Sequence, residues 1–177
     1  MIRAILACLT LAAVAMPADA QTRGSDRPEF YRTTYQIVSR MNGLCLNVEG
    51  GRLEVGARLI TWGCQGAHNE QFYAEPITRD GRVGGGMRLI AGGSHGTLCV
   101  ASSSAQGQQL VLAQCRDDTP GQVWRFEARG RRGARPLISG HNRCANIEGE
   151  RHAPGTRVIT WPCVGAINES WTFNRVN

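Results

Sequence analysis

The chain has 177 residues, of which 20 are basic and 14 acidic, so its formal net charge at neutral pH is +6. Every basic residue is Arg, and a positive charge of this size favours weak binding to anionic polymers or surfaces without indicating a fold. Without the N-terminal segment described next, the chain is the size of one domain and is long enough to bury a single hydrophobic core.

The first 20 residues have the pattern of a secretory signal peptide. Arg3 supplies a positive charge, Ala4–Met16 is nearly all apolar, and Ala18-Asp19-Ala20 is a typical cleavage site. The apolar run is too short to cross a bilayer as a helix. We therefore predict that residues 1–20 are removed, that the mature chain begins at Gln21, and that it is secreted or periplasmic.

The mature chain begins with a polar stretch at 21–33, which predicts a loose leader. From residue 34 onward, short β-prone runs alternate with turn signals, and no stretch has helical periodicity. Met41-Asn42-Gly43 and Arg79-Asp80-Gly81-Arg82 are typical of hairpin turns, and Gly84-Gly85-Gly86 leads into the second group of strands. The expected strands are Tyr35–Ser39, Leu44–Val48, Leu59–Trp62, Gln71–Ala74, Leu89–Ile90, Leu98–Ala101, Leu110–Ala113, Val123–Phe126, Leu137–Ser139, Cys144–Ile147, Val158–Trp161 and Trp171–Phe173.

The chain also contains an internal repeat. Residues 45–72 and 144–171 align without a gap and are identical at most positions, and residues 99–124 form a looser third copy. Each copy holds a pair of cysteines and ends on an aromatic residue, which indicates repetition of one structural unit. Three units of four short strands predict a closed all-β fold. The predicted repeats lie at about 35–83, 87–128 and 135–177, within one domain at 34–177.

The cysteines follow the repeat. Six remain after the loss of Cys8 with the signal peptide, and one pairing is favoured because each unit contains its own two. An exported chain meets an oxidising compartment, and no C-x-x-C or H-E-x-x-H spacing indicates a metal site. The predicted disulfides are Cys45–Cys64, Cys99–Cys115 and Cys144–Cys163.

Each repeat ends on a motif that resembles the Q-x-W signature of ricin-type (ricin B-like) β-trefoil lectins. Gln122-Val123-Trp124 keeps the motif, whereas Glu70-Gln71-Phe72 and Glu169-Ser170-Trp171 are degenerate versions of it. The resemblance covers residues 35–177. It implies a β-trefoil with pseudo-threefold symmetry, in which a six-stranded barrel is capped by three hairpins and the motif aromatics lie in the core.

The resemblance also implies where sugars bind. In the family, a pocket is formed by an acidic residue two positions after the first Cys, an aromatic just before the second Cys, and an Asn beside the Q-x-W motif. The aromatic face stacks on the C–H face of a pyranose, while the polar side chains hold its hydroxyl groups. The corresponding residues are Asn47, Trp62 and Asn69 in the first repeat, and Asn146, Trp161 and Asn168 in the third.

The middle repeat has Ala101, Ala113 and Gly121 at these positions, so we predict that it does not bind. The other two repeats depart from the family pattern as well. The family's acid is replaced by Asn, which removes a charged acceptor, and the polar residue two positions before the aromatic is Ile60 or Ile159. Both changes predict weaker binding or altered specificity.

Other interpretations of these residues remain open. Trp62 and Trp161 could be ordinary packed aromatics beside a disulfide, and Asn47 and Asn146 could be turn residues that bond to their own backbone. One acid lies two residues after each Asn, namely Glu49 in the first repeat and Glu148 in the third. Each of these acids either adds an acceptor for a sugar hydroxyl group or only starts the next turn.

Two further features carry charge. Glu70 and Glu169 replace a structural residue of the family, and because an unpaired buried carboxylate is costly, we expect an Arg partner or partial exposure.

The basic run at Arg129–Arg135 is interpreted as a solvated hairpin between the second and third repeats. The alternative is an anion-binding patch, but no aromatic residue is interleaved for base stacking, and no nucleic acid is expected.

The sequence offers no catalytic arrangement. The histidines His68, His95, His141 and His152 show no ligand spacing, and neither an acid/base pair nor a serine-nucleophile motif is present. We therefore expect no enzyme, metal or cofactor. Three functions remain: a secreted carbohydrate-binding module for glycans or glycoconjugates, a receptor-binding accessory subunit of a multicomponent toxin resembling cytolethal distending toxin, or a protein-contact or inhibitor module without a sugar site.

Overall fold

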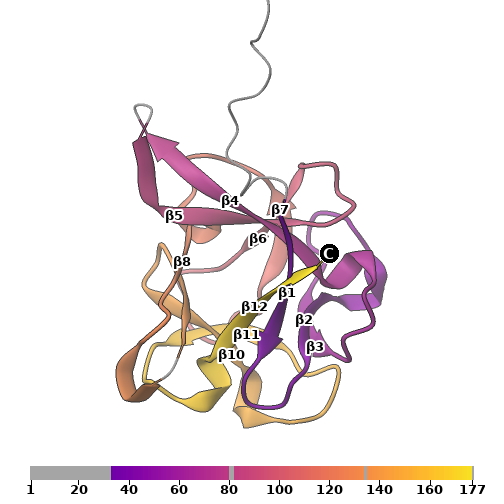
Figure 1. The fold of residues 1–177 in the computed structure, drawn as a ribbon, viewed down its shortest axis with the longest axis vertical. Helices are drawn as coiled ribbons and strands as arrows, with labels where there is room; N and C mark the ends of the chain where they lie inside the picture. Colours follow the sequence, from indigo (N-terminus) through magenta and orange to yellow (C-terminus); the bar gives the residue numbers. More distant parts are fainter. Residues whose placement is uncertain (1–32, 80–81, 134, 177) are drawn as a thin grey trace, which may run out of the picture.

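The structure, a computed structural model, describes residues 33–79, 82–133 and 135–176 (Figure 1). The predicted signal peptide and all but the last residue of the predicted leader lie outside the described residues. The strands are β1 (Thr34–Ser39), β2 (Cys45–Val48), β3 (Leu59–Trp62), β4 (Gln71–Arg79), β5 (Arg82–Ala91), β6 (Leu98–Ala101), β7 (Val111–Gln114), β8 (Trp124–Phe126), β9 (Leu137–Ser139), β10 (Arg143–Ile147), β11 (Val158–Pro162) and β12 (Trp171–Val176).

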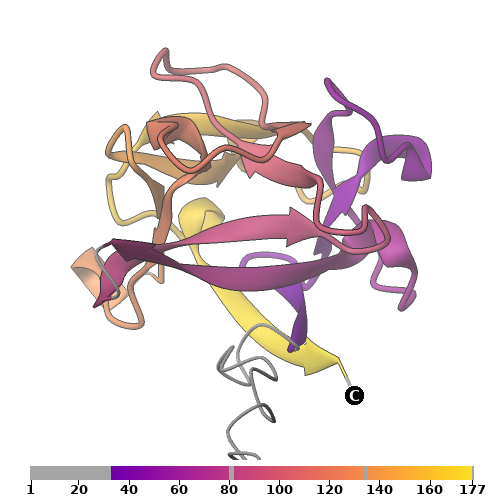
Figure 2. The same cartoon turned by 90° about the horizontal axis from the view of Figure 1, so that it is seen from above.

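Each predicted strand overlaps one of these strands. β4 and β5 are longer than predicted and form an extended hairpin that runs across the view in Figure 2. Gly84–Gly86, predicted to precede the strand, lies inside β5. Part of the reason is packing, because a Cβ at Gly86 would lie only 2.8 Å from Val123 Cγ1. A strand therefore passes close to another here, and glycine leaves the room.

Six strands form a closed barrel. β1 pairs with β12 and β4, β4 with β5, β5 with β8, and β8 with β9. The ring closes between β9 and β12 through the bridge Pro136–Ser170 and a hydrogen bond from Trp171 N to Arg135 O of 3.0 Å. The hairpins β2–β3, β6–β7 and β10–β11 cap one end of the barrel. The predicted β-trefoil is therefore confirmed.

The three capping hairpins interlock around the pseudo-threefold axis. Leu59 N donates to Leu110 O at 2.9 Å, and Leu110 N donates to Val158 O at 2.8 Å. All three of these side chains are completely buried. The hairpins are also joined pairwise by equivalent backbone bridges, namely Arg58–Val111, Gln109–Ile159 and Ile60–Arg157. Each hairpin therefore touches both of its neighbours, and loops of one repeat reach the surface of another.

The motif aromatics Phe72, Trp124 and Trp171 are buried in the core, as predicted. The two indole N–H groups find backbone acceptors in their own repeats, Val100 O and Ala145 O, each at 2.9 Å. Burial of an indole without such a partner would be costly.

The three disulfides are those predicted, Cys45–Cys64, Cys99–Cys115 and Cys144–Cys163. Each ties the second strand of its repeat to the loop that follows the third strand. Their sequence separations are 19, 16 and 19 residues, for which loop-closure entropy gives about 3 kcal/mol of stabilisation apiece.

Candidate functional site

In the first repeat, the predicted site residues come from one hairpin and the turn that follows it. Asn47 on β2 pairs with Ile60 on β3, and Cys45 pairs with Trp62. Directly paired residues of an antiparallel ladder share a face, so Asn47, Ile60 and Trp62 lie on the same side. Asn69 belongs to the 3-10 turn η3 (His68–Glu70), and its Nδ2 donates to Asn47 Oδ1 at 2.8 Å.

The third repeat builds the same arrangement. Asn146 pairs with Ile159, and Asn168 lies in the turn η7 (Ile167–Glu169). Asn168 Nδ2 donates to Asn146 Oδ1 at 2.8 Å and to the Ile147 carbonyl at 3.0 Å. Asn146, Asn168 and Trp161 together line a cavity of about 570 Å³. The structure thus brings the predicted triplet of the third repeat into one pocket.

The two tryptophans are not packed core residues. Trp62 is 43% exposed and Trp161 is 38% exposed, and both are among the most exposed large apolar residues of the described chain. The disulfide next to each one therefore does not bury it. An indole held half in water presents a free apolar face, which is what stacking on a sugar requires.

Each tryptophan is also flanked by a loop from another repeat, which the sequence analysis did not predict. A Cβ at Gly155 would lie 3.7 Å from the Trp62 ring, and one at Gly107 would lie 3.8 Å from the Trp161 ring. Both glycines have positive φ, and their N–H groups donate to Thr61 O and Thr160 O at 2.7 Å. The first-repeat site therefore borders on the third repeat, and the third-repeat site on the second.

The asparagine amides are largely buried. Asn47 and Asn146 are each 4% exposed and Asn168 is 6% exposed. They bond across to the other Asn of their repeat rather than to their own backbone turn. Asn168 Oδ1 is buried and has no hydrogen-bond partner among the described residues. Buried acceptors without a partner are uncommon in folded proteins.

The two acids after the asparagines start turns, and they are also paired. Glu49 opens η2 (Glu49–Gly51) and contacts Arg58 at 2.6 Å. Glu148 opens η6 (Glu148–Glu150) and contacts Arg157 at 2.9 Å. Arg157 also donates to Gln109 Oε1 of the second repeat at 3.2 Å. Glu148 still lines the third-repeat cavity, so it remains near any ligand bound there.

The expectation for the acids of the degenerate motifs was wrong. Glu70 is completely buried and Glu169 is 1% exposed, and neither has an Arg partner among the described residues. Glu70 Oε1 accepts from Gln36 Nε2 and from the Gln65 backbone N–H, both at 2.7 Å, and also from Gly66 N–H.

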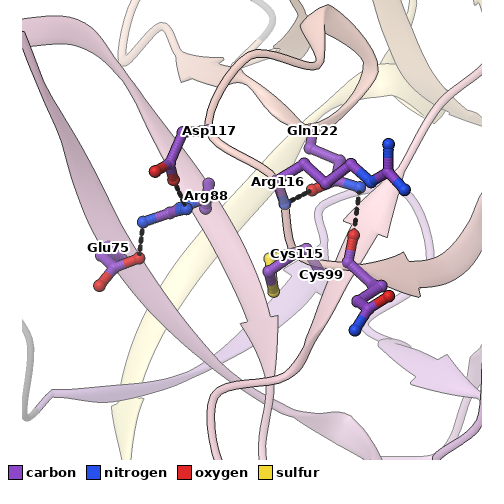
Figure 3. A network of polar contacts seen from close by, with 8 residues as sticks. Glu75, Arg88, Cys99, Cys115, Arg116, Asp117 and Gln122 are labelled. Atoms are coloured by element: carbon purple, nitrogen blue, oxygen red, sulfur yellow. Dashed lines mark hydrogen bonds and ion pairs between the residues drawn. A yellow bond between two sulfur atoms is a disulfide. The ribbon is translucent and has the colours of Figure 1, made fainter.

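Glu169 likewise accepts from Val164 N–H at 3.1 Å and Gly165 N–H at 2.6 Å. Backbone amides of the loop after each disulfide thus supply the donors that a buried carboxylate requires. Gln122 does the same in the middle repeat, where its Oε1 accepts from Arg116 N at 2.8 Å (Figure 3). The motif residue is therefore a loop anchor that either a Glu or a Gln can provide.

The middle repeat cannot hold the third polar residue of a pocket. A Cβ at Gly121 would lie 2.3 Å from the Ser102 carbonyl oxygen, so no side chain fits without backbone movement. Elsewhere in this repeat, Arg88 on β5 lies between Glu75, at 2.5 Å, and Asp117, which follows the disulfide Cys99–Cys115 (Figure 3). The lack of room at Gly121 supports the prediction that only the first and third repeats carry family-type pockets.

The basic run remains at the surface where the structure describes it. Arg131 and Arg132 are exposed in the turn η5 (Arg131–Gly133), while the Arg135 guanidinium lies 5.4 Å from the centre of the Phe126 ring. Among the described residues, no group of three or more His, Cys, Asp and Glu side chains could hold a metal ion. No helix in this part of the chain is both long and apolar enough to span a membrane.

The sequence and the fold are both similar to those of known proteins. The sequence profile of the "Ricin-type beta-trefoil lectin domain" matches residues 33–171. A search of curated protein sequences finds no match. Among solved structures, the designed threefold-symmetric protein ThreeFoil superposes with a TM-score of 0.66 at 22% identity, over 79% of this chain and 96% of that one.

Two natural proteins are similar at the same level. The Macrolepiota procera ricin B-like lectin, solved in complex with lactose, has a TM-score of 0.62 at 20% identity, over 81% of this chain and 95% of that one. The Haemophilus ducreyi cytolethal distending toxin has a TM-score of 0.62 at 17% identity, over 88% of this chain and 90% of that one. These likenesses show the fold, and the profile match shows the family. The chain belongs to the ricin-type β-trefoil lectin family.

Proposed function

We propose that this protein is a secreted lectin that binds pyranose units of glycans through shallow pockets in its first and third repeats. The observation that carries the proposal is the recurrence of one arrangement at two equivalent places: a half-exposed tryptophan beside a hydrogen-bonded pair of asparagines. The middle repeat, which lacks this arrangement, has no room for it at Gly121.

The chemistry of each pocket suits a sugar. The exposed indole face of Trp62 or Trp161 stacks on the C–H face of a pyranose, and the asparagine amides exchange hydrogen bonds with its hydroxyl groups. Since a hydroxyl group exchanges a bond with water for one with protein, these hydrogen bonds add little net affinity, and the ring contact supplies most of it.

A glycan array probed with the mature protein tests this proposal. We expect binding to glycans with accessible terminal pyranose units and loss of that binding when Trp62 and Trp161 are both replaced by Ala. A mature protein that is folded, as shown by circular dichroism, but binds no glycan on the array would contradict the proposal.

A second candidate is the receptor-binding accessory subunit of a multicomponent toxin. It is favoured by the similarity to the Haemophilus ducreyi cytolethal distending toxin, whose aligned chain is covered almost entirely. The two candidate functions differ in whether the protein acts alone or as part of a complex. A neighbouring gene for a nuclease or another effector, and co-purification of its product with this protein, would favour the toxin subunit. Genes unrelated to an effector would favour the free lectin.

A further inference from the structure

At the positions that line the third-repeat cavity, the first repeat differs in charge at one residue. The segment Glu49-Gly50-Gly51 of the first repeat corresponds to Glu148-Gly149-Glu150 of the third, so Glu150 takes the place of Gly51. Both residues have left-handed backbone, with φ of 69° at Gly51 and 54° at Glu150. Glycine adopts this conformation freely, whereas other residues seldom do. Non-glycine residues held in it are concentrated at functional sites.

Glu150 is placed to meet a ligand. It lines the third-repeat cavity together with Asn146, Trp161 and Asn168. The first repeat shows the direction of its side chain, because a Cβ added at Gly51 would lie 4.0 Å from Asn69 Nδ2. By the repeat correspondence, the Cβ of Glu150 projects toward the amide of Asn168. We therefore assign the carboxylate to the asparagine side of the pocket lining.

The carboxylate of Glu150 has no ion-pair partner in the described part of the chain. Within residues 33–79, 82–133 and 135–176, it also has no hydrogen bond, and the residue is exposed. The neighbouring Glu148 is paired with Arg157. The lining also includes the apolar residues Ile159, Ala166 and Val164, of which Val164 is 46% exposed. The third-repeat pocket thus combines an aromatic platform and apolar lining residues with one carboxylate that no described residue pairs.

We propose that Glu150 makes the third-repeat pocket select pyranose units that carry a positively charged amino group, such as hexosamines with a free amine, and disfavour anionic sugars. The first-repeat pocket, with Gly51, does not select by charge. An ammonium group on the sugar forms a charge-assisted hydrogen bond with the carboxylate, whereas a sugar carboxylate is repelled. This inference rests on the proposed function, because it assigns specificity to one of the two proposed sugar sites.

The test first disables one of the two sites by removing its tryptophan, and then changes residue 150 or residue 51 in the site that remains. Trp62→Ala leaves the third-repeat pocket intact, and its binding to a glucosamine oligomer, an N-acetylglucosamine oligomer of equal length and sialyllactose is measured by calorimetry at low salt. We expect the amine form to bind about fivefold more tightly than the acetylated form, as an exposed ion pair allows, and the preference to fade at high salt. Glu150→Gln and Glu150→Gly in this background should abolish the preference. Gly51→Glu in the Trp161→Ala background should create it. Glu54→Gln, at an exposed acid outside the third-repeat cavity, is the control for overall charge.

The outcomes separate the two claims. If Glu150→Gln leaves the preference unchanged, or weakens the amine and acetylated oligomers equally, the charge selection is wrong while glycan binding stands. If Glu54→Gln reduces the preference as much as Glu150→Gln does, the effect belongs to the whole surface and the inference also fails. If the parent protein binds none of these oligomers and no array glycan, both the proposed function and this inference are overturned.

Discussion

Replacing Trp62 or Trp161 with Ala is expected to remove most of the affinity of the corresponding pocket. Trp62 is 43% exposed and Trp161 38%, and for a residue with about 250 Å² of surface this leaves roughly 100 Å² accessible to a ligand. A pyranose stacked on one face covers about half of it, which is worth about 1 kcal/mol at 25 cal/mol/Å², with a similar contribution from the covered face of the sugar. The expected loss is therefore about 1 to 3 kcal/mol per site, or roughly fivefold to a hundredfold in Kd.

The assay compares both single variants and the double variant with the parent. Binding of a soluble glycan, taken from the array, is measured by calorimetry, and binding to a dense glycan surface is measured in parallel. Thermal unfolding should change little, because neither ring lies in the core. Val55→Ala is the matched control, since Val55 is 68% exposed but does not line the third-repeat cavity.

On the dense surface, two weak sites in one molecule act together. The double variant should then lose far more surface binding than either single variant, because the second contact is intramolecular once the first is made. A folded double variant that binds the glycan surface as tightly as the parent would show that these pockets are not the site. The protein-contact function would then become the better explanation.

Three other outcomes are expected. Glu70→Ala should lower the free energy of unfolding, measured by urea denaturation, by about 2 to 3 kcal/mol, because it leaves buried hydrogen-bond donors without an acceptor. Glu70→Gln keeps an acceptor and should lower it by less than about 1 kcal/mol. Equal losses for the two variants would show that the charge of Glu70 matters rather than its acceptor. Gly121→Ala should destabilise by about 2 kcal/mol or more, since its Cβ meets the Ser102 carbonyl, and an unchanged melting temperature would refute that contact. N-terminal sequencing of exported protein should begin at Gln21, and material that retains Ala4–Met16 would contradict the predicted signal peptide.

The sequence alone determined the features that depend on local pattern and repetition. Strands and hairpin turns are specified by neighbouring residues, so the elements around Met41-Asn42-Gly43 were predicted from the local pattern. The disulfide Cys45–Cys64 was predicted from the repeat, because each unit carries its own pair of cysteines. The repeat then transferred each local assignment to the equivalent places, and the family motif placed Trp124 in the core. The asparagines of each predicted triplet were assigned through the resemblance to the family, whose pocket positions correspond to them in the sequence.

Only the tertiary structure decided what depends on contacts between distant segments. Gly155 reaches the Trp62 ring across more than 90 residues of sequence, and no local pattern encodes a contact over that separation. The burial of Glu70 was predicted wrongly for the same reason. The backbone N–H groups that donate hydrogen bonds to its carboxylate are in place only once the loop after the disulfide has folded around it. The position of the Glu150 carboxylate at a pocket likewise became visible only when the fold placed it beside an aromatic platform, because a carboxylate acquires a role from the groups that surround it in space.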